Sequence, residues 1–224
     1  MDLYEAMRTL PSVKRYKPDP VSDDDIRTIL TAATWAPSGG NAQPWEFIVV
    51  RDPALKKKLA DLYRGGLKFL WDHPRRQGYR ELDKRTFQKT MFRKSHHLRD
   101  HMEETPVLIV VAMNREKDNL PRYGVLKAIR ADSVFTSIMP CIQNLMLAAR
   151  GLGLGTCLTT ALNILEEDAK IALGMPEETQ IVALIPLGYP ADDFKPVTRI
   201  PAEEFTHWDG WRRDRAGDQK GTAE

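Results

Sequence analysis

A ten-residue loop at positions 36–45 constrains this chain more than any other part of its sequence. The loop follows a helical hydrophobic pattern and precedes an apolar run at residues 47–50 that is typical of a strand. Its two prolines and two glycines fix the backbone and permit the close approach of another group. The side chains of Ser38, Asn41 and Gln43 supply hydrogen-bond donors and acceptors. The loop therefore suits a flat ligand with polar edges, and a well-capped turn between a helix and a strand is the alternative.

Hydrophobic periodicity divides most of the chain into helices and strands. Ser22 followed by three acidic residues predicts the start of one helix. Helices are predicted at residues 2–10, 23–35, 131–150 and 166–173 and from Pro53 through Leu62, and strands at residues 46–51, 107–112 and 180–187. Because two helices precede the first strand and helices then alternate with strands, the pattern indicates a layered α/β or α+β architecture.

The helix predicted at residues 131–150 carries more apolar side chains than one buried face requires. We therefore expect it to be buried on several sides, with a kink or a junction at Pro140. A chain of this size rarely buries every face of such a helix by itself, so the pattern is consistent with a subunit interface.

The composition excludes several classes of protein. The chain has 224 residues, 42% of them hydrophobic, which is ample for a core and indicates one or two domains. Its net charge of +2 does not favour binding to nucleic acid or to an acidic membrane. Apolar stretches such as residues 107–113 are too short to span a membrane, and the N-terminus does not resemble a secretory signal. We expect a cytoplasmic protein in which Cys141 and Cys157 are free thiols.

The loop resembles the flavin-binding loop of the nitroreductase superfamily, whose pattern is Ala-Pro-Ser-x-x-Asn-x-Gln-Pro-Trp before a strand. Residues 12–21 resemble the N-terminal phosphate-binding segment of that family, and residues 148–156 resemble its second flavin-lining segment. Residues 185–190 and 199–201 are similar to its closing strand and its C-terminal segment. These collinear matches cover most of residues 2–211, so the resemblance is more specific than any single motif.

The resemblance implies an α+β protein with the nitroreductase-like fold, in which helices flank a central mixed sheet and two chains form an intertwined homodimer. Residues 1–211 would form a single FMN-binding domain. Residues 64–104, which are rich in basic and aromatic side chains, would form a lid or border the substrate, and packing beside a solvated face is the alternative. Residues 212–224 are poor in apolar side chains and predict a disordered tail.

The same resemblance implies a flavin oxidoreductase that uses NADH or NADPH. The nucleotide would transfer hydride to FMN, and a small electron-poor acceptor of nitroaromatic or quinone type would then be reduced in a ping-pong mechanism. This chemistry depends on positioning at the ring, so we assign no catalytic side chain. Two alternatives remain open: a flavin destructase or reductive dehalogenase with the same fold, and a flavin-binding module without turnover.

The cofactor-binding residues follow from the matching positions of the family pattern. The phosphate would be bound by Arg8, Ser12, Lys14, Arg15 and Arg199. The ring would be bound by Pro37, Ser38, Gly39, Asn41 and Gln43, and by the backbone N–H groups of Leu158, Thr159 and Thr160.

The sequence departs from the family pattern immediately before Ser12. The family has two basic residues there, whereas this chain has Leu10 and Pro11. We expect Arg8 or Arg15 to supply the missing cation, and a surface basic cluster without a ligand is the alternative.

Two further patterns predict no site. The glycines at positions 151, 153 and 155 follow a helix rather than a strand, so they do not indicate a Rossmann dinucleotide loop. His97 and His101 are four residues apart and share one face of a helix, but the neighbouring side chains are cationic and supply no third ligand. We therefore expect no metal site.

Overall fold

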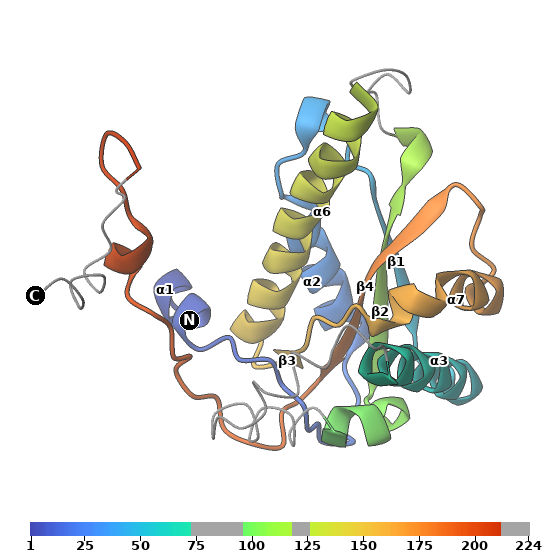
Figure 1. Ribbon diagram of the computed structural model, residues 1–224. Helices are drawn as coiled ribbons and strands as arrows, with labels where there is room; N and C mark the ends of the chain where they lie inside the picture. Colours follow the sequence, from blue (N-terminus) through green and yellow to red (C-terminus); the bar gives the residue numbers. More distant parts are fainter. Residues whose placement is uncertain (73–95, 118–125, 212–224) are drawn as a thin grey trace, which may run out of the picture.

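The computed structural model describes residues 1–72, 96–117 and 126–211 (Figure 1). The α-helices are α1 (Leu3–Arg8), α2 (Asp23–Thr34), α3 (Pro53–Asp72), α6 (Leu126–Gly151) and α7 (Glu166–Leu173). The strands are β1 (Trp45–Val50), β2 (Val107–Asn114), β3 (Gly155–Thr156) and β4 (Thr179–Gly188). Short 3₁₀ helices are η1 (Gly39–Asn41), η3 (Met102–Glu104), η4 (Arg115–Lys117), η5 (Ala161–Leu165) and η6 (Ala202–Phe205). Every predicted helix and strand is present.

The four strands form one sheet in the order β1–β2–β4–β3. Successive residues of a strand point to opposite faces, and β2 shows this alternation in its packing. Val107, Ile109 and Val111 pack with α2 and α6, whereas Leu108 and Val110 pack with α3 and α7. Figure 1 shows these helix pairs on the two sides of the sheet. Both faces are covered, which explains why β2 is a continuous apolar run.

Each pair of neighbouring strands in the described chain is antiparallel. The sheet therefore differs from the mixed sheet that the resemblance implied. An apolar run does not show whether a strand pairs parallel or antiparallel with its neighbours, because a strand covered on both faces has the same composition in both cases.

One side of α6 faces the core, and another side remains uncovered in the described chain. Ile138, Ile142 and Leu145 are fully buried, whereas Phe135 and Met139 are 39% and 44% exposed. The helix is 26 residues long and continues through Pro140 as one element. One chain therefore does not provide the burial on several sides that the sequence predicts.

The segment at 64–104 begins as an extension of a helix. Residues 64–72 continue α3, which is 20 residues long, and residues 96–100 are helical before η3. The remainder of the predicted lid, residues 73–95, and the predicted tail at 212–224 lie outside the described residues. In the parts that the structure covers, no helix has both the length and the hydropathy needed to cross a bilayer.

Candidate functional site

Residues 12–21, the predicted phosphate segment, lie beside the chain that leads into residues 158–160, the predicted ring segment. The Val13 N–H donates to the Thr156 carbonyl at 2.9 Å, and Lys14 Nζ lies 2.6 Å from Cys157 Sγ. A Cβ on Gly155 would lie 2.6 Å from the Val13 side chain, so this close approach requires glycine. Residues 13–14 and 155–157, far apart in sequence, are thereby brought together, and residues 158–160 follow directly.

Thr159 has a structural role within the ring segment. Its backbone N–H donates to the Leu184 carbonyl at 3.0 Å, and its hydroxyl donates to the same oxygen at 2.8 Å. The Leu184 N–H donates back to the Thr159 carbonyl at 2.9 Å. We expected the Thr159 N–H to donate to a flavin ring, but it already donates to Leu184. A ligand at this segment would therefore contact Leu158 and Thr160 first.

The last described segment runs alongside the first. The Val197 N–H donates to the Arg8 carbonyl at 2.9 Å, and the Ala191 N–H donates to the Arg15 carbonyl at 3.0 Å. The guanidinium of Arg15 forms an ion pair with Asp192 at 3.8 Å. Arg8, Arg15 and Arg199 are all exposed, so the predicted cations lie on two adjacent chain segments at the surface.

Sequence reasoning missed one cation at this junction. Arg150, in the last turn of α6, is only 6% exposed. Its Nε donates to the Thr9 carbonyl at 2.9 Å and to the Thr9 hydroxyl at 3.1 Å. Its guanidinium carbon lies 3.8 Å above the centre of the Phe194 ring. The only indication in the sequence is an arginine at the end of an apolar helix.

The loop at 36–45 is held in an unusual backbone conformation. Gly40, Asn41 and Gln43 have φ values of 58°, 54° and 47°, which is a region that favours glycine and tolerates asparagine. The Gly39 N–H donates to the Ser137 hydroxyl on α6 at 3.1 Å, and the Gln43 N–H donates to the Ser38 hydroxyl at 3.1 Å. Hydrogen bonds within the loop and to Ser137 thus hold the loop in this shape.

The loop contacts α6 near its middle, whereas the phosphate segment lies at its C-terminal end (Figure 1). Ser137, which holds the loop, and Arg150, which contacts Thr9, are 13 residues apart. At 1.5 Å per residue this separation is about 20 Å. Leu158 of the ring segment packs with the cluster on the α6 side of the sheet, whereas Cys157 and Ala161 beside it pack on the α3 side. Among the described residues, no hydrogen bond joins the loop to residues 158–160.

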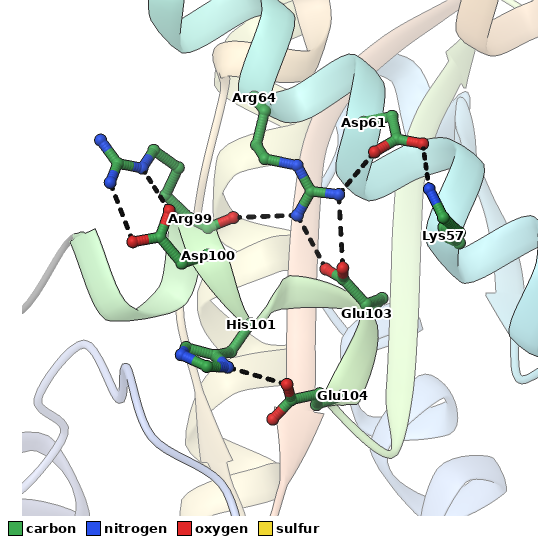
Figure 2. Close-up of polar contacts among 8 residues, drawn as sticks. All are labelled: Lys57, Asp61, Arg64, Arg99, Asp100, His101, Glu103 and Glu104. Carbon is green, nitrogen blue, oxygen red and sulfur yellow. Dashed lines mark hydrogen bonds and ion pairs between the residues drawn. The ribbon is translucent and has the colours of Figure 1, made fainter.

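An ion-pair network fixes the described part of the 64–104 segment to α3 (Figure 2). Arg64 donates to Glu103 at 2.8 and 3.3 Å, to Asp61 at 2.5 Å, and to the Arg99 carbonyl at 3.2 Å. His101 Nδ1 lies 2.8 Å from a Glu104 oxygen. The helical turn at 96–100 and η3 are therefore anchored on α3.

The charges in this network shift the pKa values of its members. Partial burial is the largest single effect and raises the pKa of Glu103, but the hydrogen bonds from Arg64, a backbone hydrogen bond and the charge of Arg64 together lower the pKa below its ordinary value. The pKa of Asp61 is lowered by hydrogen bonds from Lys57 and Arg64.

We predict that Glu103→Gln lowers the free energy of unfolding by about 1 kcal/mol at neutral pH, because a partly exposed charge-assisted pair is lost. The folded-state pKa of Glu103 is depressed, so its stabilisation is present above the unfolded-state pKa and is lost as the pH falls through the folded-state pKa. Urea unfolding over this range should show the two proteins converging in acid. The exposed Glu116→Gln serves as the control, and a pH-independent difference would contradict the prediction.

Burial raises the pKa values of three titratable groups in the core. Burial, with the nearby charge of Cys157, raises the pKa of Tyr63 to about 12 and raises the pKa of Tyr16. Burial raises the pKa of Cys141 to about 12. These three groups therefore stay neutral at physiological pH.

Metal binding finds no support in the described part of the chain. It contains no cluster of three or more histidine, cysteine or acidic side chains suited to a metal ion. The His97 and His101 rings stack with their centres 4.4 Å apart. Burial, followed by the nearby charges of His101 and Arg15, lowers the pKa of His97.

The fold and the arrangement of these segments define a class of protein. The model of the Nitroreductase family matches residues 10–189, which is most of the chain. The chain belongs to the nitroreductase family, and its nitroreductase-like α+β fold is confirmed. The family is consistent with an oxidoreductase.

Individual relatives agree with this assignment. An NADH dehydrogenase from Thermus thermophilus is 30% identical over 221 residues, which cover 88% of this chain and 91% of that protein. An iodotyrosine deiodinase from Nematostella vectensis is 27% identical, and the match covers 91% of this chain and 74% of that protein. Among solved structures, a nitroreductase-type protein from Desulfovibrio desulfuricans in complex with FMN has a TM-score of 0.65 and 25% identity. That match covers 95% of this chain and 99% of the other.

Proposed function

We propose that this protein is an FMN-dependent oxidoreductase that uses NADH or NADPH to reduce a small electron-poor acceptor, with a nitroaromatic or a quinone as the default. The observation that carries the proposal is the convergence of residues 13–14, residues 156–157, which lead directly into 158–160, and the last described segment, which are separate in sequence. A relative of similar fold binds FMN, and relatives of comparable length carry NADH dehydrogenase names.

The residues present fit the demands of FMN. Ser12, Lys14 and the basic side chains of the first and last segments would bind its phosphate. Leu158 and Thr160, together with the loop, would hold the ring edge. When bound, FMN supplies the hydride chemistry. The protein orients the cofactor and keeps one ring face open to the nucleotide and the acceptor.

We propose that the working form is a homodimer in which each flavin contacts both chains. The loop is held beside Ser137, about 20 Å along α6 from Arg150, where the phosphate segment lies, so one chain leaves the parts of each site apart. A two-fold axis would place the loop of one chain against the ring segment of the other.

Exposed apolar side chains support this dimer. The segment that follows β4 extends away from the sheet beside α1 (Figure 1). Phe205, Trp208 and Trp211 on it are 61%, 74% and 76% exposed. Phe135 and Met139 on α6 are exposed as well, at 39% and 44%, and a partner chain would cover such side chains.

The decisive experiment is anaerobic reduction of the purified protein. We expect a yellow protein whose flavin absorbance bleaches on addition of NADH or NADPH and returns on addition of an acceptor. A yellow protein that neither nucleotide bleaches would favour a binding module without turnover. A colourless protein that FMN does not reconstitute would contradict both functions.

Reductive dehalogenation is the second candidate, because an iodotyrosine deiodinase aligns with 91% of this chain. The same reduced protein should be mixed with halogenated phenols as well as with nitroaromatics and quinones. Release of halide at a rate that exceeds the reduction of the other acceptors would favour this candidate.

We predict that Asn41→Ala weakens FMN binding about fivefold, which corresponds to one net hydrogen bond of roughly 1 kcal/mol. Asn41 has a positive φ, which alanine tolerates poorly. Asn41→Gly removes the same side chain and keeps this conformation, so it should show the same loss. Flavin fluorescence titration measures both, with the exposed Thr31→Ala as control. Unchanged affinity in Asn41→Gly would remove the amide from the site.

A further inference from the structure

Arg150 is a buried cation that has no anionic partner in the described chain. The side chain is 6% exposed, and its Nε donates to the Thr9 carbonyl and hydroxyl. No carboxylate among the described residues forms an ion pair with it, and the N–H groups on its two terminal nitrogens donate to no described residue. A buried guanidinium is costly to desolvate unless a charge or further hydrogen bonds compensate it.

The position of Arg150 coincides with the gap in the phosphate-binding pattern. Thr9, its hydrogen-bond partner, directly precedes Leu10 and Pro11, where the expected basic residues are absent. Phe194, on which it stacks, belongs to the segment that leads to Arg199. Arg150 thus lies where the first and last segments meet at the end of α6.

The cations that the sequence suggested as replacements are less suitable. Arg15 is exposed and forms an ion pair with Asp192. Arg8 is exposed, and its backbone carbonyl is held by Val197. Arg150, in contrast, is oriented by two contacts, so little side-chain entropy remains to be lost when an anion binds.

We propose that Arg150 is a phosphate-binding residue, whose terminal nitrogens donate to a phosphate monoester while its Nε stays on Thr9. This inference rests on the proposed function, under which the phosphate is that of FMN. A guanidinium presents paired N–H groups that match two phosphate oxygens, so it replaces the missing basic pair with one residue from another part of the chain.

A purely structural role is the competing explanation. A cation at a helix C-terminus interacts favourably with the helix dipole, and the contact with Thr9 links α1 to α6. A structural link would affect the binding of every flavin to the same extent. A phosphate contact would affect only the flavin that carries a phosphate.

The test compares FMN with riboflavin, which lacks the phosphate, by fluorescence titration of flavin-stripped protein. We expect Arg150→Met to lower the ratio of FMN affinity to riboflavin affinity by about tenfold. The affinity ratio of Arg150→Lys should lie between those of Arg150→Met and the wild type, because an ammonium group keeps the charge but lacks the paired N–H groups of the guanidinium. Arg27→Met, at an exposed arginine of α2, should leave the ratio unchanged.

Three results would overturn the assignment. They are an unchanged affinity ratio in Arg150→Met, with or without an equal loss for both flavins, a wild-type ratio in Arg150→Lys, and a loss confined to the binding of NADPH. The last would place a nucleotide phosphate at Arg150. If Arg150→Met does not fold, Arg150→Lys decides between the two roles. Wild-type protein that binds neither flavin would overturn the proposed function itself, which separates that failure from a wrong assignment of Arg150.

Discussion

Gly66→Ala should destabilise the folded protein by about 3 kcal/mol, although it adds a single methyl group. Gly66 lies in α3, where the helix packs against η5. A Cβ at this position would lie 2.0 Å from the Ala161 carbonyl oxygen and 3.0 Å from its carbonyl carbon. Both atoms belong to the backbone, so no side-chain rotation relieves the contact, and α3 must move away from η5.

Urea unfolding of Gly66→Ala and Gly151→Ala measures this effect. Gly151 ends α6, and a Cβ there would meet nothing within 4 Å. The free energy of unfolding of the control, Gly151→Ala, should therefore stay within about 1 kcal/mol of the wild-type value. Because η5 directly follows Thr160, Gly66→Ala should also release flavin more readily. Equal stability of the two variants would contradict the prediction, because it would show that η5 moves away from α3 with little loss of folding free energy.

Two variants that bind flavin weakly should recover flavin binding when they are mixed. The first carries Ser12→Ala and Lys14→Met in the phosphate segment, and the second carries Ser38→Ala and Asn41→Gly in the loop. If each site is built from both chains, a mixed dimer contains one intact site and one doubly altered site. After random exchange of subunits, roughly a quarter of all sites should bind FMN.

Flavin absorbance after unfolding, refolding and gel filtration of the mixture measures the recovery. Each variant carried alone through the same procedure is the control. Recovery near zero in a mixture that forms mixed dimers would place each site within one chain. A monomer in gel filtration would contradict the dimer directly.

The sequence predicted the elements and the family because both depend on local patterns. Ser22 is the helix cap that it was predicted to be, with its hydroxyl accepting from the Asp25 N–H at 3.0 Å. The apolar runs at β2 and β4 became strands because alternate side chains pack on opposite faces. Four separated motifs were enough to indicate the family.

The arrangement of the site was less accessible to sequence reasoning because it depends on contacts between distant residues. Arg150 and Thr9 are 141 residues apart, and no local pattern connects them. The N–H of Thr159 is used in the sheet because Leu184 lies opposite it. The extension of α3 to Asp72 is stabilised by packing on η5, which overrides its weak periodicity.

The length of α6 has a consequence for the proposed dimer. One continuous helix carries Ser137, which holds the loop proposed to contact one flavin, and Arg150, which is proposed to bind the phosphate of the other. In the proposed dimer, the two cofactor sites would therefore be built on one shared rigid element.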